Sequence, residues 1–484
     1  MLAPPPPPPA ETAPARPGSL TAATTGALGL LAGVVALLLV GSTSGWDHPD
    51  TWDERVAHLV PVVEASRGLE FRHPVRVEFL TPEEYSEYAR IEAEDLTDED
   101  EVSLEEWVAL LRAFGLVSGS FDPVDATNEL VDEGTLAVYA FDDHTIRVRG
   151  TEVDRDLEVT LVHEMVHALQ DQHFDLGRLA EVETSGEATA LRAVVEGDAM
   201  LVEQRFAEIR SMGDQFFGGP GELPDDLMDD MAHHDDLFDE VPEYLVASFS
   251  APYLLGLPLI AGIEAEEGWE GVNALLVDPP TTERELLFPS RIGDGAVTVE
   301  VDLPGGVDDG EVDGDLGAFG LYLVLATRID HLEALESVEA WTGDHYRTFE
   351  VDDRLCVALV VATSGGEGHD RLLDALSRWA GSRPSEAAAN VGDEGDRLRV
   401  ETCDPGPDVG EEISGSLDAA LLASGRVWMW SFAIMSGSDR IEADCFGAYV
   451  VENLAVDLLF SPDPSDEEVD EIWDVIARAW RACL

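Results

Sequence analysis

The sequence contains no lysine and few cations of any kind. Its 28 basic residues are all arginine and face 100 acidic residues, which gives a formal net charge of −72. A surface of this charge repels a phosphate backbone, so nucleic acid is excluded as a partner. Because 45% of the residues are still hydrophobic, the composition is that of a folded protein rather than a disordered acidic tail. Salt at about 1 M shortens the screening length to about 3 Å and makes such self-repulsion tolerable, so we expect a halophilic source.

Cysteine is scarce as well, and none of the cysteines has the CxxC spacing of a metal site. The even count is compatible with two disulfides in a protein that is exported from the cell. Three pairings are open, and buried free thiols are the alternative. All of the cysteines fall in the last third of the chain, at Cys356, Cys403, Cys445 and Cys483.

The leader, residues 1–46, contains a long apolar run without charge. It opens with a proline run over residues 4–9, which predicts an extended or disordered start. Residues 27–40 are apolar throughout, which is long enough for the core of a signal peptide, and residues 21–40 approach the length of a membrane span. A cleaved signal peptide and an N-terminal membrane anchor both remain open. In either case we expect the body to be extracellular or on the outer face of the membrane.

The body of the chain shows signals for both strands and helices. Residues 74–80 predict a strand, and Thr81 followed by Pro82 is typical of the start of a helix. Residues 135–141 and 144–149 predict two strands around a two-residue turn, so a sheet should directly precede the next helix. The same patterns predict helices ending near residue 115 and over 157–172, 183–209, 242–263 and 318–332, and strands over 297–303 and 427–432.

The length of 484 residues suggests two or three domains. After the leader we expect a main α+β domain over residues 47–380. Residues 381–484 then form a smaller cysteine-containing α/β segment of unknown role.

One motif in the chain predicts specific chemistry. Residues 163–167 read His-Glu-Met-Val-His, within a strongly apolar helical segment. On a helix, His163 and His167 lie on one face and can reach one Zn²⁺, while Glu164 points at the open position of the metal as a general base. Catalytic zinc takes three protein ligands, so a third must come from elsewhere in the chain.

Three residues are candidates for that third ligand. His173 lies at the spacing of an HExxHxxGxxH pattern, but Gln170 replaces the glycine, and on a continuous helix His173 would point about 240° away from His167. Glu196 lies among apolar neighbours in the next helix, where an unpaired carboxylate would be costly. Glu187 is on the same helix at nearly the opposite angle, so both glutamates cannot face one metal. The choice between them stays open at this point.

The segments HEMVHALQDQHFDL and VVEGDA resemble the gluzincin-type zinc metallopeptidases, in particular an exported, mostly uncharacterised family with the pattern HExxHALQDQHF and an EGDA motif. The resemblance implies that Glu196 is the third ligand beside His163 and His167, with Glu164 as the base. It also implies a zincin-like core, in which a mixed sheet accompanies an active-site helix and a third-ligand helix.

Two later segments are similar to segments of the same family, with departures. Residues 279–289 carry Phe288 where the family has a histidine, and residues 340–346 differ from the family's Gly-Trp-Gly-Gly-Asp-Arg-Tyr at three positions. In the second segment, which we expect to be a turn, His345 or Tyr346 would suit chemically as the group that stabilises an oxyanion.

Three functions are compatible with these residues. The first is a zinc metallopeptidase acting on a peptide or protein substrate, with Asp171 and Asp198 as candidates to orient the zinc-bound histidines. The second is a non-catalytic surface protein with a structural or vestigial zinc site, which the altered segments suggest. The third is a hydrolase of another bond, such as an amide of the cell envelope.

Overall fold

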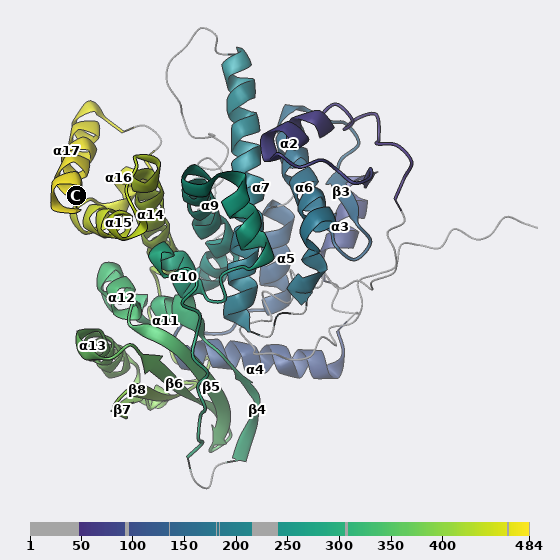
Figure 1. Ribbon diagram of the computed structural model, residues 1–484. Coiled ribbons are helices and arrows are strands. Elements are labelled where there is room, and N and C mark those ends of the chain that lie inside the picture. Colours follow the sequence, from purple (N-terminus) through teal and green to yellow (C-terminus); the bar gives the residue numbers. More distant parts are fainter. Residues whose placement is uncertain are drawn as a thin grey trace, which may run out of the picture.

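The computed structural model describes residues 48–91, 96–134, 136–180, 182, 184–214, 241–304, 308–461 and 464–483. The predicted leader lies outside these residues. Within them the fold combines many helices with two separate sheets, which confirms the α+β class (Figure 1).

The elements are as follows. The helices are α2 (Val60–Arg67), α3 (Pro82–Ala89), α4 (Asp98–Phe114), α5 (Pro123–Gly134), α6 (Arg155–Phe174), α7 (Ser185–Asp214), α9 (Glu243–Val277), α10 (Glu283–Leu287), α11 (Gly317–Ala326), α12 (His331–Val338), α13 (Gly366–Ser382), α14 (Ser416–Met435), α15 (Arg440–Asn453), α16 (Val456–Leu459) and α17 (Asp466–Cys483). The strands are β1 (Arg76–Leu80), β2 (Ala137–Ala140), β3 (Thr145–Arg149), β4 (Asp308–Gly314), β5 (Trp341–Val351), β6 (Arg354–Thr363), β7 (Asn390–Asp393) and β8 (Arg397–Cys403).

The smaller sheet has the order β1-β3-β2, with β1 parallel and β2 antiparallel to β3. Its strands confirm the predicted strand over 74–80 and the predicted pair of strands before the HExxH helix. Thr81 caps α3 with its side chain, as its position before Pro82 predicted. The sheet, α2 and α6 share one hydrophobic core, and β2 is the edge strand in contact with α6. The HExxH helix therefore packs directly under the edge of a sheet.

Long helices form the middle of the molecule, where α7 packs between α6 and α9, and α9 packs against α14 (Figure 1). The closest approach of α7 and α9 is at Gly197 and Gly256, because a Cβ placed on Gly197 would lie 2.3 Å from the backbone of Gly256. Helix α9 is the one described helix that is long and apolar enough to cross a membrane, but two thirds of its apolar window, 67%, is buried in the protein. It extends the core helix predicted over 242–263.

The larger sheet is antiparallel with the order β4-β5-β6-β8-β7. Strand β8 pairs with β6, and a disulfide joins Cys356 of β6 to Cys403 of β8. The second disulfide, Cys445–Cys483, joins α15 to α17. The domain boundary predicted near residue 380 is therefore wrong, because residues on both sides of it build the same sheet.

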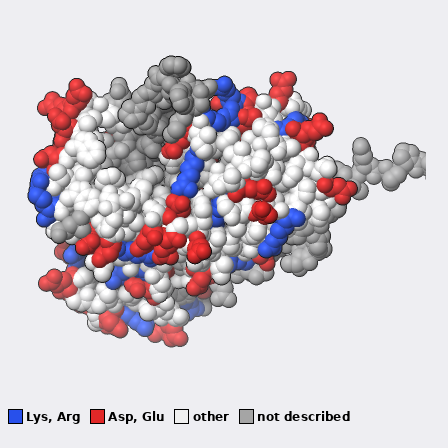
Figure 2. Space-filling view, turned by 45° about the horizontal axis from the view of Figure 1, so that its top comes forward, with Lys and Arg blue, Asp and Glu red and all other residues white. Residues whose placement is uncertain are grey.

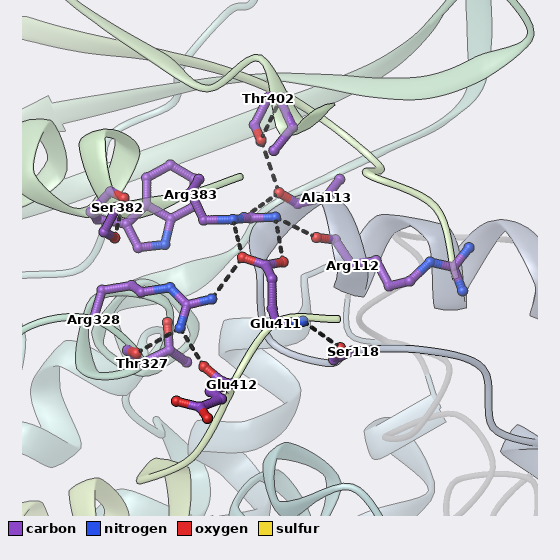
Figure 3. Close-up of polar contacts among 12 residues, drawn as sticks. Arg112, Ala113, Ser118, Thr327, Arg328, Ser382, Arg383, Thr402, Glu411 and Glu412 are labelled. Carbon is purple, nitrogen blue, oxygen red and sulfur yellow. Dashed lines mark hydrogen bonds and ion pairs between the residues drawn. The ribbon is translucent and has the colours of Figure 1, made fainter. Parts of the chain in front are cut away.

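Figure 3 shows a polar network that joins the end of α4 to this part of the chain. The buried Arg383 donates to the last carbonyls of α4, those of Arg112 and Ala113, at 2.8 Å each. Glu411 accepts from Arg383 at 3.0 Å and from Arg328 at 2.7 Å, so one carboxylate holds two guanidinium groups. The network fastens the N-terminal helices to the larger sheet.

Three predicted elements differ from the structure. Residues 297–303 form no strand, and instead lie as an extended segment whose Val299 and Val301 cover one face of the larger sheet. The helix predicted over 318–332 is divided into α11 and α12. Residues 427–432, predicted as a strand, lie inside helix α14, because a short apolar run does not by itself distinguish a buried strand from a buried helix.

Candidate metal centre

Helix α6 carries the HExxH motif in a buried position. The helix starts with Asp154 as its N-cap, whose side chain accepts from the backbone of Leu157. Sheet and helices cover it on several sides, so even polar residues such as Glu164 and His167 are buried. The rings of His163 and His167 lie edge to face with their centroids 4.6 Å apart. A helix held this tightly fixes the relative positions of the two imidazoles.

Glu196 of α7 completes a compact group of three donor atoms. Its Oε2 lies 3.2 Å from Nε2 of His163 and 3.3 Å from Nε2 of His167, and the two nitrogens are 2.9 Å apart. Among the described residues this is the one group of three or more histidine, cysteine or acidic side chains close enough to share a metal ion. Four-coordinate zinc with bonds of about 2.0–2.1 Å separates its ligand atoms by about 3.3 Å, which fits these spacings.

The electrostatics of the group favour a bound cation. Burial lowers the pKa of His163, but hydrogen bonds with Glu196 and Glu203 outweigh it and raise the pKa above its usual value. Burial likewise opposes ionisation of Glu196, but the two imidazoles nearby hold the pKa of its carboxyl far below the usual range. The group therefore attracts positive charge, which a divalent ion would supply in place of protons.

The other two candidates for the third ligand are not brought to the histidines. Glu187 lies at the beginning of α7, where its backbone N–H donates to Thr184. His173 lies in the last turn of α6 and its Nε2 donates to the carbonyl of Glu70 at 2.8 Å. Neither side chain belongs to the group of donor atoms around His163 and His167.

Both histidines are oriented through their second ring nitrogen. Nδ1 of His163 is 2.8 Å from Glu203, which lies seven residues after Glu196 on the same face of α7. Nδ1 of His167 is 3.0 Å from Oε1 of Gln170. With Nδ1 protonated in each ring, Nε2 is left free to bind a metal. Glu203 and Gln170 were not predicted in this role, although the spacing of seven residues from Glu196 indicates that Glu203 lies on the same face of the helix.

Of the two aspartates predicted to orient the histidines, Asp198 does so indirectly and Asp171 does not. Asp198 contributes through Gln170, whose Nε2 donates to it at 2.8 Å, and it is held in turn by the fully buried Arg67. Asp171 does not contact the histidines of the motif. It accepts from the hydroxyl of Tyr139 at 2.8 Å and contacts Nδ1 of His144 at 3.0 Å, so it joins α6 to the β2–β3 hairpin.

Glu164 is held at the edge of the smaller sheet. Its Oε2 accepts from the backbone N–H of Tyr139 in β2 at 2.6 Å. Burial raises the pKa of this carboxyl above its usual value, although the neighbouring histidines oppose the shift. A carboxylate with a raised pKa close to a metal centre suits a group that accepts and later returns a proton.

Tyr253 of α9 is a further side chain at this centre, and it was not predicted from the sequence. Its phenol hydrogen-bonds with Glu196, and burial raises its pKa well above the usual value, so that it keeps its proton. The close crossing of α7 and α9 at Gly197 and Gly256 places it there. Nothing in the sequence around Tyr253 indicated this, because the contact depends on how two distant helices pack.

His345 and Tyr346, predicted as oxyanion-stabilising residues, are not at this centre. They lie within strand β5 of the larger sheet rather than in a turn. His345 lies 3.4 Å from Asp313 of β4, and Tyr346 is fully buried with its ring edge-on to Phe114. The prediction is wrong because the segment is a central strand whose side chains serve the sheet.

Comparison with known proteins gives no relative for this chain. No family model matches it, and neither a curated protein nor a solved structure is significantly similar to it.

Proposed function

We propose that the protein is a zinc-dependent peptidase with a gluzincin-type centre and a zincin-like core. The observation that supports this most directly is the convergence of His163, His167 and Glu196, with the carboxylate of Glu164 fixed beside them. The donor set, two imidazoles and one carboxylate with a separate general base, is the one that hydrolytic zinc sites use.

Zinc held by these three residues would supply a Lewis acid that polarises the substrate carbonyl. Glu164 takes a proton from the attacking water as its oxygen bonds to the carbonyl carbon, and gives it to the amide nitrogen as the carbon–nitrogen bond breaks. Tyr253 keeps its proton at neutral pH and can donate a hydrogen bond to the negative oxygen that develops. Edge strand β2 offers an extended substrate a strand to lie beside.

The departures from the family pattern are compatible with an active centre. Phe288, which replaces a histidine, is fully buried, with the guanidinium of Arg426 over its ring at 4.7 Å. Residues 340–346 extend into strand β5. Both changes lie in packed regions and leave the residues around Glu164 intact. Two disulfides also fit a protein that works outside the cell.

Hydrolysis by a Glu164→Gln variant tests this function. The substituted amide keeps the shape of the side chain but cannot accept the proton, so we expect kcat to fall by at least about a hundredfold while zinc stays bound. The measurement is cleavage of a mixed peptide library in molar salt, with zinc content determined on the same samples. Full activity in the variant would contradict the mechanism, and a wild type that cleaves no peptide would favour a non-catalytic protein or a hydrolase of another bond.

A further inference from the structure

Arg192 is a half-buried cation beside the metal centre, and it has no partner among the described residues. It lies four residues before Glu196 on α7, one turn away on the same face. Some arginines in the interior are paired with carboxylates, as Arg67 is with Asp198 and Arg112 is with Asp404.

The packing of α7 against α9 brings Arg192 and Tyr253 to the same place. A Cβ on Gly256 would lie 2.1 Å from the carbonyl oxygen of Ala193, so α9 crosses α7 directly beside Arg192. The phenol of Tyr253 hydrogen-bonds with Glu196, and the positive charge of Arg192 acts on that phenol and partly offsets the rise that burial gives its pKa. Cation, phenol and candidate zinc ligand therefore form one continuous group.

The carboxylates of the metal centre already have other partners. Glu196 is shared by His163 and His167, and Glu164 accepts from the backbone of Tyr139. A guanidinium that is partly removed from water gains most from a two-pronged contact with a carboxylate. The described part of the protein does not supply that carboxylate, so a ligand is the natural source.

We propose that Arg192 binds a carboxylate of the substrate and makes the enzyme prefer peptides with a negative charge next to the scissile bond. This inference rests on the proposed function. Four residues of helix rise about 6 Å, which corresponds to about two residues of extended peptide. The carboxylate is therefore expected within about two residues of the cleaved bond, either as the free C-terminus or as an aspartate or glutamate side chain.

Matched peptide pairs test the preference and separate its two sources. In the first pair, the residue directly after the scissile bond is the last residue, and it ends in a free carboxylate in one peptide and in a carboxamide in the other. In the second pair, the peptide continues beyond that position, and a glutamate in one peptide is replaced by glutamine in the other at the same distance from the scissile bond. Cleavage of each is measured as kcat/KM with the full chain in molar salt. We expect about a tenfold preference for the carboxylate in at least one pair, which corresponds to one charge-assisted contact. Equal rates within both pairs would overturn the proposal.

The variants Arg192→Gln and Arg192→Lys identify the residue responsible. Arg192→Gln should lower kcat/KM for the preferred carboxylate peptide about tenfold more than for its neutral partner, and Arg192→Lys should restore only part of the preference because it lacks the planar fork. Arg397→Gln, on β8 of the other sheet, serves as the matched control and should keep the wild-type preference. An equal effect of Arg192→Gln on both members of a pair would contradict the assignment.

A binding measurement tests whether Arg192 recognises a carboxylate even if no peptide is cleaved. Calorimetry with the same peptide pairs and the metal-free Glu164→Gln protein reports carboxylate recognition without catalysis. Tighter binding of the carboxylate member, lost in a Glu164→Gln/Arg192→Gln double variant, supports the proposal even where the peptidase function fails. Equal binding of both members by the metal-free protein, together with no wild-type cleavage, would reject both.

Discussion

A chain of hydrogen bonds from neutral and charged side chains fixes the ring orientation of His167 in the HExxH motif. His167 is held through Gln170, and Gln170 is held by Asp198 and by the carbonyl of Val195. Asp198 is in turn fixed by Arg67, which also donates to Asn273 at 2.7 Å. This chain of contacts links the metal centre to α2 and α9 through side chains that are almost completely buried.

A Gln170→Leu variant tests the importance of this chain. The change keeps the approximate size of the side chain but removes the acceptor for Nδ1 of His167, so we expect the affinity for zinc to fall by about 10–100-fold. Competition with a chelator in molar salt measures it. Gln172→Leu, on the same helix but bonded to the backbone near Arg72, is the control. Unchanged affinity in Gln170→Leu would show that His167 needs no such support.

At the residue scale, the sequence predicted those parts of the centre that depend on helix geometry alone. The spacing of His163, Glu164 and His167 within one helix was sufficient to bring them together. Glu196 could be chosen as the third ligand only through the resemblance to a known family, because spacing alone left Glu187 as an alternative. Tyr253 and Arg192 could not be predicted, since their position depends on the crossing of α7 and α9.

The short helix α10 places the carboxyl group of Glu283 in the interior, close to other acidic side chains. Glu283 is almost completely buried, and one of its oxygens has no hydrogen-bond partner among the described residues. Burial, with a further contribution from the charge of Asp315, raises the pKa of Glu283 to about 8. Asp344 of β5 is similarly placed, and burial raises its pKa to about 7. Both groups bind a proton more tightly in the folded than in the unfolded chain.

This difference predicts how stability depends on pH. A carboxyl group whose pKa is raised on folding contributes to the free energy of unfolding, and this contribution is fully present below the pKa of the unfolded chain, about 4. The contribution is lost as the pH rises through the pKa values in the folded protein, about 7 for Asp344 and about 8 for Glu283. We therefore expect Glu283→Gln to flatten the loss of stability between about pH 4 and 8. Urea unfolding at constant salt measures it, with the exposed Glu300→Gln as control. A Glu283→Gln profile parallel to that of the wild type would contradict this account.

At the element scale, local signals were reliable where one helix or hairpin carried them. The Thr81 cap of α3, the apolar pattern of α6 and the β2–β3 pair were predicted correctly, although four residues rather than two connect Ala140 to Thr145. Strand β5 and helix α14 were not. The start of β5 reads as a polar turn, and the short apolar run in α14 does not distinguish a buried strand from a buried helix. The larger sheet joins strands far apart in sequence, which local patterns do not reveal.

At the scale of the whole molecule, excess negative charge dominates. Figure 2 shows acidic side chains distributed over the visible face, with the arginines scattered between them. Ion pairs such as Arg205–Glu264 and Arg440–Glu266 neutralise part of this charge. With a net charge of −72, most of the carboxylates remain without a cationic partner. Their mutual repulsion must be screened by the solvent.

Salt dilution tests this consequence. Lowering the salt concentration from about 3 M to about 0.1 M lengthens the screening length to about 10 Å and strengthens repulsion between carboxylates across the surface. We expect the Tm to fall by tens of degrees or the chain to be unfolded outright at low salt. Circular dichroism followed during heating measures it. A cooperative transition at the same temperature in dilute buffer would contradict adaptation to high salt.

Binding of one zinc ion by His163, His167 and Glu196 is the central claim. Its most direct test is metal analysis of the purified protein together with Glu196→Ala and Glu187→Ala variants, all handled in molar salt. The account predicts about one zinc per chain in the wild type and in Glu187→Ala, and little or none in Glu196→Ala. A wild type without zinc, or a Glu196→Ala protein that retains it while Glu187→Ala loses it, would contradict the account.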